Sequence, residues 1–427
     1  MENNFLYTNP LSLITGDTVT RNLAEEEKYS INTDLSRPIR IFVDGRSLIY
    51  PEIYERGIGA YSEHHLRALG LLLSKFKSEL LVALPSNALT KSLSPCLKTL
   101  SATPGIIIKP WFEARKFQVD LYHIIDQMTV IIGYDSPLLA APSNIPVTTT
   151  FYDLIPLVVK DLHFDQWHPT LQLIYQERLL ELKESDATIL TISQTTAHDL
   201  HNLLQIPHCK LHTIMAGVRP PSESLITDDQ LSKKWGISQP YFLVVGGLEK
   251  HKNFSTTYEA FIKHCQAGLP GSLVVVGSLS DPVKATYAAH STSHIPTRVH
   301  FTGFINNSEL DLLYRLATAL IFPSLYEGFG FPVAEAMARG CPVIVSNLAS
   351  LPEIVGDAGI ILPSPNINNL AEALKFTIEQ PNKLEDLRKK GKENSKKFTW
   401  DNVAKATLNK WLELINKYQT NVLSSIK

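Results

Sequence analysis

Short apolar stretches alternate with longer amphipathic stretches over most of this chain, and no other feature limits its possible folds so strongly. In the amino-terminal half, the helical stretches include residues 61–76 and 170–184. The expected strands of that half are residues 39–43, 80–84, 105–109, 120–124, 129–132, 146–151, 187–192 and 210–215. Alternation of this kind predicts a parallel sheet with helices on both faces.

A break in the alternation separates this series from a second one. Gly217, Pro220, Pro221 and a polar run occupy the break, which is typical of a linker. The expected strands of the second series are residues 241–245, 273–277, 298–302, 319–322, 342–346 and 360–362. The predicted organisation is an irregular extension (1–37), a first α/β domain (38–216), a linker (217–240), a second α/β domain (241–399) and a carboxyl-terminal helix and tail (400–427).

Charge and cysteine content exclude several classes of function. The chain has 427 residues, with 40 Lys and Arg against 42 Asp and Glu, so bulk attraction to nucleic acid is not expected. The four cysteines are far apart, which favours reduced thiols in a cytoplasmic protein over a disulfide frame or zinc site. The sequence has neither a signal-peptide pattern at its start nor an apolar run of membrane-spanning length.

The stretch EGFGFPVAE, residues 327–335, carries the strongest functional signal. It follows an apolar strand and precedes a helix-forming string, so it predicts a strand, a glycine turn and a helix. Pro332 suits the first helical position, where its missing N–H is not needed. Such a turn directs backbone N–H groups and a helix dipole at an anion. Glu327 and Glu335 at its two ends favour a ligand with a central phosphate and flanking hydroxyls, such as a nucleotide sugar.

The second series opens with YFLVVGGLEKHKN, in which a strand ends at Gly246 and Gly247. Lys252 follows where a helix is expected to start. A lysine in this position can neutralise a diphosphate, and the alternative is a surface lysine near a turn. We favour phosphate binding because the strand, glycines and helix occur together.

Two loops of the first half are candidates for the opposite wall of a cleft. Gly57 and Gly59 stand at an expected helix start after the first strand, where small residues let a ligand approach the backbone. Tyr152 and Asp153 follow the strand at residues 146–151. Asp153 can orient a hydroxyl or act as a base, and the alternative is that it caps the next turn. Since ligands bind beyond the carboxyl ends of parallel strands, both loops are expected to face the second domain.

Together these segments resemble a known family. VGGLEKHKN, FTGFINNSEL and IFPSLYEGFGFPVAEAMARGCPVIVSNLASLPEIVGDAG, with GIGAY, YDLIPL and SDATILTISQTTAHDL in the first half, are similar to the retaining glycosyltransferases of the sucrose-synthase/mannosyltransferase group, glycosyltransferase family 4. The resemblance implies the GT-B fold: two facing Rossmann-like domains with parallel sheets, a cleft between them, and a carboxyl-terminal helix crossing back to the first domain.

The resemblance also implies roles for these residues. Glu335 would bind the ribose hydroxyls, since a carboxylate accepts two O–H bonds. Glu327 would contact the transferred sugar, Lys252 would bind the diphosphate, and Gly59 would let the first-half loop close on it. The amides around four residues would hold sugar hydroxyls and diphosphate: Gly328, Phe329, Gly330 and Phe331.

Three positions depart from the family pattern. Gly247 and His251 stand where relatives often carry an arginine, and Tyr152 stands where many carry a histidine that helps hold the donor sugar. Lys252 is therefore expected to be the fixed cation at the phosphates, helped by helix dipoles and by His251 when protonated. Tyr152 still offers a hydroxyl, but tyrosine is a poor base at neutral pH.

The resulting hypothesis is a retaining glycosyltransferase that moves a sugar from a GDP-mannose-like or UDP-sugar donor to a glycan, lipid-linked or small-molecule acceptor. The chain contains no Asp-x-Asp pair, so no metal cofactor is expected. The alternatives are a catalytically silent binding subunit and a nucleotide-sugar epimerase on the same fold. Lys75 and Lys77 beside the apolar helix at 61–76 leave peripheral contact with the inner face of a membrane open, although a core-facing helix is favoured.

Overall fold

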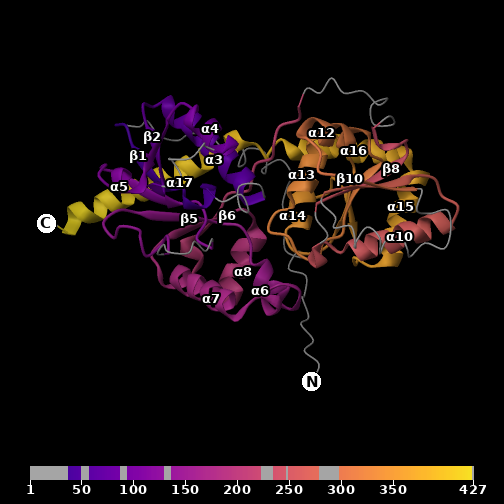
Figure 1. The fold of residues 1–427 in the computed structure, drawn as a ribbon, viewed down its shortest axis with the longest axis horizontal. Helices are drawn as coiled ribbons and strands as arrows, with labels where there is room; N and C mark the ends of the chain where they lie inside the picture. The colour runs from indigo at the N-terminus through magenta and orange to yellow at the C-terminus, as the bar shows by residue number, and fades with distance from the viewer. Residues whose placement is uncertain are drawn as a thin grey trace.

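The computed structural model describes residues 37–49, 57–86, 94–128, 136–222, 234–246, 249–277 and 298–425. These residues form two lobes, each built on a parallel sheet, as Figure 1 shows. The predicted fold class is confirmed. The extension at 1–36, the whole of the expected strand at 129–132, Gly247 and the middle of the linker lie outside the described residues.

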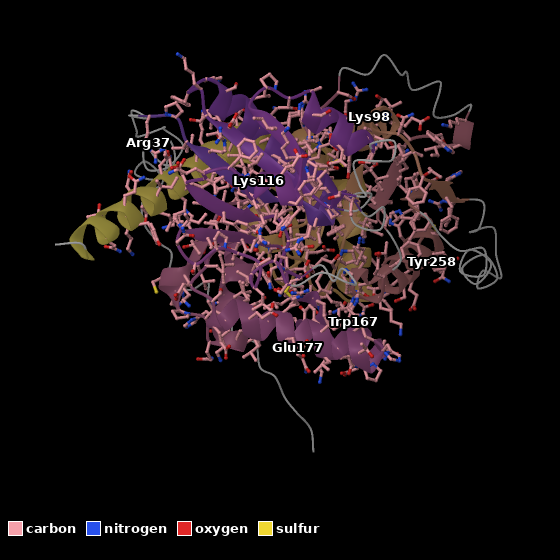
Figure 2. All side chains as sticks on the ribbon, turned by 60° about the vertical axis from the view of Figure 1, so that its left-hand side comes forward. Arg37, Lys98, Lys116, Trp167, Glu177 and Tyr258 are labelled. Atoms are coloured by element: carbon pink, nitrogen blue, oxygen red, sulfur yellow. The ribbon has the colours of Figure 1, made fainter. Side chains whose placement is uncertain are left out.

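The first sheet has seven strands in the order β3-β2-β1-β4-β5-β6-β7. Its strands are β1 (Arg40–Asp44), β2 (Glu79–Leu84), β3 (Ile106–Pro110), β4 (Leu121–Ile124), β5 (Val147–Phe151), β6 (Thr188–Thr191) and β7 (Leu211–Thr213). Its α-helices are α3 (Gly57–Ser74), α4 (Pro95–Ser101), α5 (Trp111–Ala114), α6 (Ile155–Val158), α7 (Pro169–Glu184) and α8 (Gln194–Leu204). Figure 2 shows Lys116 on the face of this half turned to the viewer and Glu177 on the layer of α7.

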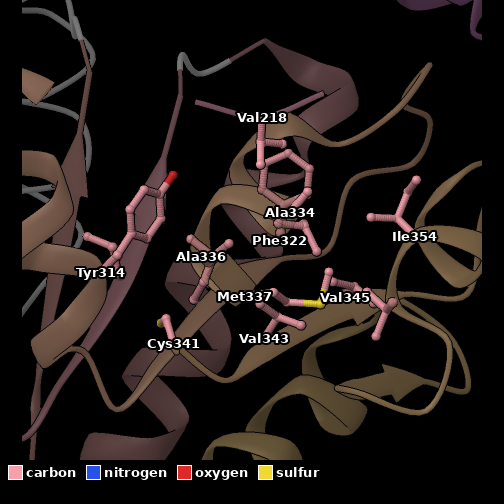
Figure 3. Close-up of a cluster of buried hydrophobic side chains, with 14 of the residues drawn as sticks. Val218, Tyr314, Phe322, Ala334, Ala336, Met337, Cys341, Val343, Val345 and Ile354 are labelled. Atoms are coloured by element: carbon pink, nitrogen blue, oxygen red, sulfur yellow. The ribbon is translucent and has the colours of Figure 1, made fainter. Parts of the chain in front are cut away.

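The second sheet has six strands in the order β10-β9-β8-β11-β12-β13. Its strands are β8 (Tyr241–Val245), β9 (Ser272–Val276), β10 (Val299–Gly303), β11 (Ala319–Phe322), β12 (Val343–Ser346) and β13 (Ile360–Leu362). Its α-helices are α10 (Phe254–Gln266), α12 (Asn307–Leu316), α13 (Phe331–Ala338), α14 (Leu351–Val355), α15 (Ile367–Glu379) and α16 (Pro381–Ser395). Figure 3 shows Met337 of α13 packed among Val343 and Val345 of β12.

Both faces of the first sheet are buried, as the near-continuous apolar strands require. Ile41 and Val43 of β1 pack on one face with Trp411, which comes from the end of the chain. Phe42, between them in sequence, packs on the other face against Tyr122, with ring centroids 4.7 Å apart. Successive side chains of a strand thus supply two separate cores.

Helix α17 (Trp400–Ser425) leaves the second half and runs along the first, as Figure 1 shows. It packs on α3, and Leu408 and Trp411 join the same core as Leu66 and Leu69 of α3. The predicted crossing helix is confirmed. The apolar side of α3, the helix for which membrane contact was left open, is therefore largely turned to the core. Leu71 remains exposed.

The two halves are joined by hydrogen bonds as well as by the chain. The carboxylate of Glu353 on α14 accepts hydrogen bonds from the amides of Gln194 and Thr195, at 3.1 and 3.0 Å, and so caps the start of α8. The Tyr326 hydroxyl donates to Asp199 at 2.5 Å. These contacts hold the carboxyl edges of the two sheets against each other.

Candidate active site

The predicted strand, glycine turn and helix are present at residues 319–338. Helix α13 begins at Phe331, directly after Gly330, whose φ of +99° is a conformation that favours glycine. The hydroxyl of Ser350 lies 2.9 Å from the carbonyl of Glu327 and 2.8 Å from that of Phe329, which fixes the turn from behind. The backbone at the start of α13 is therefore held in place before any ligand binds.

Glu327 projects from this turn with its side chain partly exposed. Ser324 donates a hydrogen bond to its carboxylate at 2.9 Å. Burial raises the pKa of Glu327 to about 7, and the charges of Asp153 and Glu249 add to the rise, while Lys252 and the Ser324 bond oppose it. The carboxyl group therefore titrates near neutral pH. In its protonated form it can donate a hydrogen bond to a sugar hydroxyl, and in its ionised form it can accept one.

Lys252 folds back over the end of β8. A Cβ placed on Gly246 would lie only 2.8 Å from its Nζ, so the glycine makes room for the ammonium group. Its Nζ also lies 3.6 Å from the carboxylate of Glu249. The ammonium group of the lysine thus lies at the carboxyl end of the strand, the edge of a parallel sheet at which ligands bind.

His251 is buried beside this lysine, and its Nδ1 lies 2.9 Å from Nε2 of His163 in the first half. Burial lowers the pKa of His251 to about 4, and the nearby Lys252 and His163 lower it further. At neutral pH the histidine is therefore uncharged in this arrangement. The help expected from a protonated His251 requires an anion to raise its pKa.

Gly328 brings the turn into contact with the first half. A Cβ placed on it would meet the carbonyl oxygen of Tyr152 at 2.4 Å and Cβ of Asp153 at 2.7 Å. Only a residue without a side chain fits between the end of β5 and the turn. The structure therefore brings Tyr152 and Asp153 together with the donor-side turn, across the boundary between the halves.

The side chains of these two residues have structural partners. The Tyr152 hydroxyl is buried, donates to the carbonyl of Ile125 at 3.1 Å and lies 3.2 Å from the hydroxyl of Ser62. Asp153 accepts a hydrogen bond from the amide of Ile155 at 3.0 Å, so the turn-capping contact predicted as its alternative role is present. Burial also raises the pKa of Asp153 to about 6.

The other glycine loop also lies near the turn. Gly57 and Gly59 stand in the first turn of α3, and the Tyr61 ring that follows has its centroid 6.5 Å from that of Phe331. Tyr61 and Phe329 belong to one buried cluster. The starts of α3 and α13 therefore approach each other from the two domains.

Glu335 lies one turn along α13 and is also partly exposed. The Tyr314 hydroxyl is 3.5 Å from one carboxylate oxygen, and Nε of Arg219 is 4.0 Å from the other. Burial raises the pKa of Glu335, whereas Arg339 and Arg219 act to lower it. The Glu335 carboxylate thus interacts with Tyr314 and Arg219 while its side chain remains partly exposed to solvent.

Comparisons with known proteins relate this chain to the glycosyltransferases. The model of the family described as "Glycosyl transferases group 1" matches residues 227–394. O-antigen chain mannosyltransferase B of Escherichia coli is 27% identical over 287 residues, which cover 65% of this chain and 73% of that protein. This chain is a glycosyltransferase, and over residues 227–394 it is similar to the group 1 family.

Other similarities of this glycosyltransferase are less complete or concern the fold alone. The match to serotype-specific mannosyltransferase WbdA of E. coli, at 27% identity, covers 67% of this chain but only 36% of that protein. A glycosyltransferase from Rickettsia africae has a TM-score of 0.65 at 16% identity, covering 88% of this chain and 99% of that one. Anabaena HepE, solved with UDP and glucose, has a TM-score of 0.61 at 16% identity, covering 91% and 100%. Both structures support the GT-B fold.

Several residues around the site of this glycosyltransferase were not singled out from the sequence. Arg219 and Asp311 stand next to Glu335, and His163 contacts His251. Asp311 had a weak signal, because it is a charged residue directly between two leucines of the helix NSELDLLYRL. Arg219 and His163 stand in irregular segments whose position the sequence pattern does not define.

The described parts of the chain have neither a cluster of metal ligands nor a helix suited to crossing a membrane. There, no group of three or more His, Cys, Asp and Glu side chains is arranged to hold a metal ion. Over the same residues, no helix combines the length and the apolar character that crossing a membrane requires.

Proposed function

We propose that this glycosyltransferase transfers a hexose from a nucleoside diphosphate sugar to a hydroxyl group of a growing glycan, with retention of configuration and without a metal ion. One observation carries the proposal: Glu327, Lys252 and the start of α13 converge where Gly328 touches the first half. A charged donor, its leaving group and an acceptor from the first half can meet at such a junction.

Each donor group has a matching partner in the proposal. Lys252 and the amides at Gly328–Phe331 take the diphosphate, with the dipole of α13 adding to the attraction. Glu335 accepts the ribose hydroxyls, and Glu327 accepts hydroxyls of the transferred sugar. Mannose is the proposed sugar and GDP-mannose the first donor to test, because O-antigen mannosyltransferases are among the relatives. A UDP-sugar is the second, because HepE was solved with UDP and glucose.

The proposed reaction breaks the bond between the anomeric carbon and the diphosphate oxygen and forms a bond from that carbon to the acceptor oxygen on the same face. The acceptor proton moves to the departing phosphate oxygen, so the step requires no strong protein base. Donors already in place around the leaving group each contribute about 3–4 kcal/mol to its stabilisation. Lys252 and the α13 amides are the groups assigned to this task.

A screen of GDP-, UDP-, ADP- and dTDP-sugars by thermal shift tests the donor assignment, since a ligand of the native state raises stability with ln(1 + [L]/Kd). Transfer to a saccharide acceptor is then followed by NMR, with the anomeric configuration read from the product. Inverted product would refute retention, and loss of activity in EDTA that Mg²⁺ restores would refute the metal-free mechanism. Epimerised donor in the absence of acceptor would instead support an epimerase.

A catalytically silent binding subunit is the second candidate function. The neutral His251 and the internally bonded hydroxyl of Tyr152 favour it, because many relatives carry an arginine and a histidine at these two positions. Donor binding without transfer or hydrolysis, over a range of saccharide acceptors, would support this candidate against the enzyme.

A further inference from the structure

A buried carboxylate connects the linker to the helix of Glu335. Asp311 lies on α12, and its side chain is 1% exposed. One of its oxygens accepts hydrogen bonds at 2.5 Å from both Arg219 and Arg339. The other accepts from Arg219 at 2.9 Å and from the amide and hydroxyl of Ser222 at 2.7 Å each. Both carboxylate oxygens of Asp311 therefore accept hydrogen bonds from arginine. These bonds hold the pKa of Asp311 well below its usual range, although burial opposes them.

Arg219 belongs to the segment that leaves the first domain. Its guanidinium grips Asp311 through two nitrogens, which fixes the plane of the group. The preceding residue, Val218, is equally fixed: its amide donates to the carbonyl of Phe398 at 2.9 Å, and its side chain belongs to the buried cluster that includes Ala334 of α13, part of which Figure 3 shows. The linker at this point is thus a bound part of the donor domain.

Arg339 completes the arrangement from the end of α13. Its side chain is fully buried, and its guanidinium donates to the carbonyls of Glu335 and Arg219 at 3.1 and 3.0 Å. Asp311, Arg219 and Arg339 therefore hold both the helix that carries Glu335 and the linker beside it. Two arginines facing two carboxylates leave the group of four electrically balanced.

The remaining nitrogen of Arg219 faces the functional carboxylate. With Nη1 and Nη2 bound to Asp311, Nε lies 4.0 Å from Glu335, too far for a direct hydrogen bond but close enough for a strong charge interaction. We propose that Arg219 is a positioning residue for the donor: held by Asp311, it keeps Glu335 ionised and aimed at the ribose. The inference rests on the ribose role of Glu335 in the proposed function.

The charges around Glu335 give the inference a pH dependence. Burial favours its protonated form, the charge of Asp311 adds to that effect, and Arg219, Arg339 and the Tyr314 hydroxyl oppose it. Without Arg219, the pKa of Glu335 rises further. A protonated carboxyl accepts fewer hydrogen bonds from the ribose, so binding that depends on the ribose hydroxyls is lost first on the acid side.

The test compares UDP and GDP with their 2′,3′-dideoxy forms, which lack the ribose hydroxyls, by titration calorimetry between about pH 6 and pH 9. In Arg219→Met we expect affinity for the intact nucleotides to fall by about tenfold. Affinity for the dideoxy forms should be unchanged, and the pH at which the hydroxyls stop contributing should move upward. Arg219→Lys should restore part of the affinity, because a lysine keeps the charge but not the two-nitrogen grip on Asp311.

Arg388→Met is the matched control. Arg388 is another partly buried arginine of the second half, and it donates to the carbonyls of Gly340 and Ala317 rather than facing Glu335. Its loss should lower thermal stability while leaving the discrimination between intact and dideoxy nucleotides as in wild type. A change of that discrimination in Arg388→Met equal to that in Arg219→Met would mean that general loosening is responsible, and would overturn the inference.

The variant Glu335→Gln distinguishes failure of the positioning role of Arg219 from failure of the ribose role of Glu335. If wild type and Glu335→Gln both bind intact and dideoxy nucleotides equally, the ribose role of Glu335 is wrong and the proposed function fails at that residue. If Glu335→Gln loses the discrimination while Arg219→Met keeps it at every pH, only the positioning role of Arg219 is refuted.

Discussion

The two sheets share one strand order, but the polar side chains at their carboxyl ends have different surroundings. Six strands of the first sheet, from β3 to β6, follow the same order as β10-β9-β8-β11-β12-β13 of the second. In the first, Asp44 at the end of β1 forms a buried ion pair with Arg46, and the hydroxyl of Tyr152 bonds to the backbone. In the second, Glu327, Lys252 and Glu335 remain partly exposed.

This difference separates structural from chemical roles within one fold. Polar groups at the edge of the first sheet are largely satisfied by the protein, so they shape the junction. Those at the edge of the second are partly exposed, as the proposed donor contacts require, and burial raises the pKa of both glutamates. Substitutions on the second edge should therefore change chemistry and affinity, and those on the first edge should change geometry.

The largest effect is expected from Glu327→Gln, which removes the carboxylate assigned to the transferred sugar. Turnover should fall by about 10²–10³, in line with the loss of one preorganised group in the transition state, while nucleoside diphosphate affinity changes little. Steady-state kinetics and nucleotide titration measure the two effects. Wild-type turnover in this variant would contradict the central role given to the second edge.

Gly328→Ala should have the next largest effect, because it acts on the junction itself. The new methyl group meets the backbone of Tyr152, which cannot move aside as a side chain could, so the halves must separate. A displacement near 1 Å at a reacting centre costs about 100-fold in rate. Gly391→Ala on α16 is the control, since a Cβ there meets Met337 only at 3.4 Å, an ordinary van der Waals contact, and it should keep wild-type turnover.

Lys252→Met should weaken nucleoside diphosphate binding by about tenfold, because a charge-assisted bond to phosphate is lost. Titration calorimetry at low and high salt measures the affinity and its ionic component. Lys250→Met serves as the control and should bind as wild type does, because Lys250 is exposed and lies in the same 3-10 helix, Lys250–Lys252. Equal losses in the two variants would mean that only the general charge of the segment matters.

The smallest effect concerns stability. The pKa of Glu327 is about 7 in the folded protein against 4.5 for an unperturbed glutamate, so the folded state holds this proton more tightly than the unfolded chain. The stability that protonation provides is complete below about pH 4.5 and is lost as the pH rises through 7. Glu327→Gln should escape this loss and gain about 1–2 kcal/mol over wild type by pH 8, a figure reduced because water reaches the side chain.

Thermal unfolding of wild type and Glu327→Gln across this pH range measures that gain as a rise of a few °C in relative Tm. The same comparison with Asp44→Asn should give the opposite result, because the carboxylate of Asp44 forms a buried ion pair with Arg46 and the substitution removes that charge interaction. A stabilising Asp44→Asn would erase the distinction between the two edges.

The sequence pattern predicted the order and kind of the elements closely. The expected strand at residues 342–346 begins one residue later, at Val343, and the turn before α13 has the predicted form. Local signals suffice there, because apolar runs, glycines and a proline act over a few residues. Long-range contacts are different in kind: Arg219 and Asp311 are 92 residues apart, and no local pattern pairs them.

Side-chain direction set another limit. Tyr152 was placed correctly at the end of a strand, but whether its hydroxyl faces a ligand depends on Ser62 and Ile125, which arrive from other elements. The capping contact of Asp153, in contrast, involves Ile155 two residues on and was anticipated as an alternative. The accuracy of the prediction thus follows the distance along the chain over which each contact acts.

Helix α17 has a consequence for the order in which the molecule is completed during synthesis. Trp411, fully buried, donates from Nε1 to Thr148 of the first sheet at 3.2 Å, and Leu408 and Ile415 fill the same core. The first half leaves the ribosome long before these residues do. One apolar face of its sheet therefore stays exposed until the second half has been synthesised. Folding of the amino-terminal half therefore ends last, and a helper that shields that face during translation would act on the half that was made first.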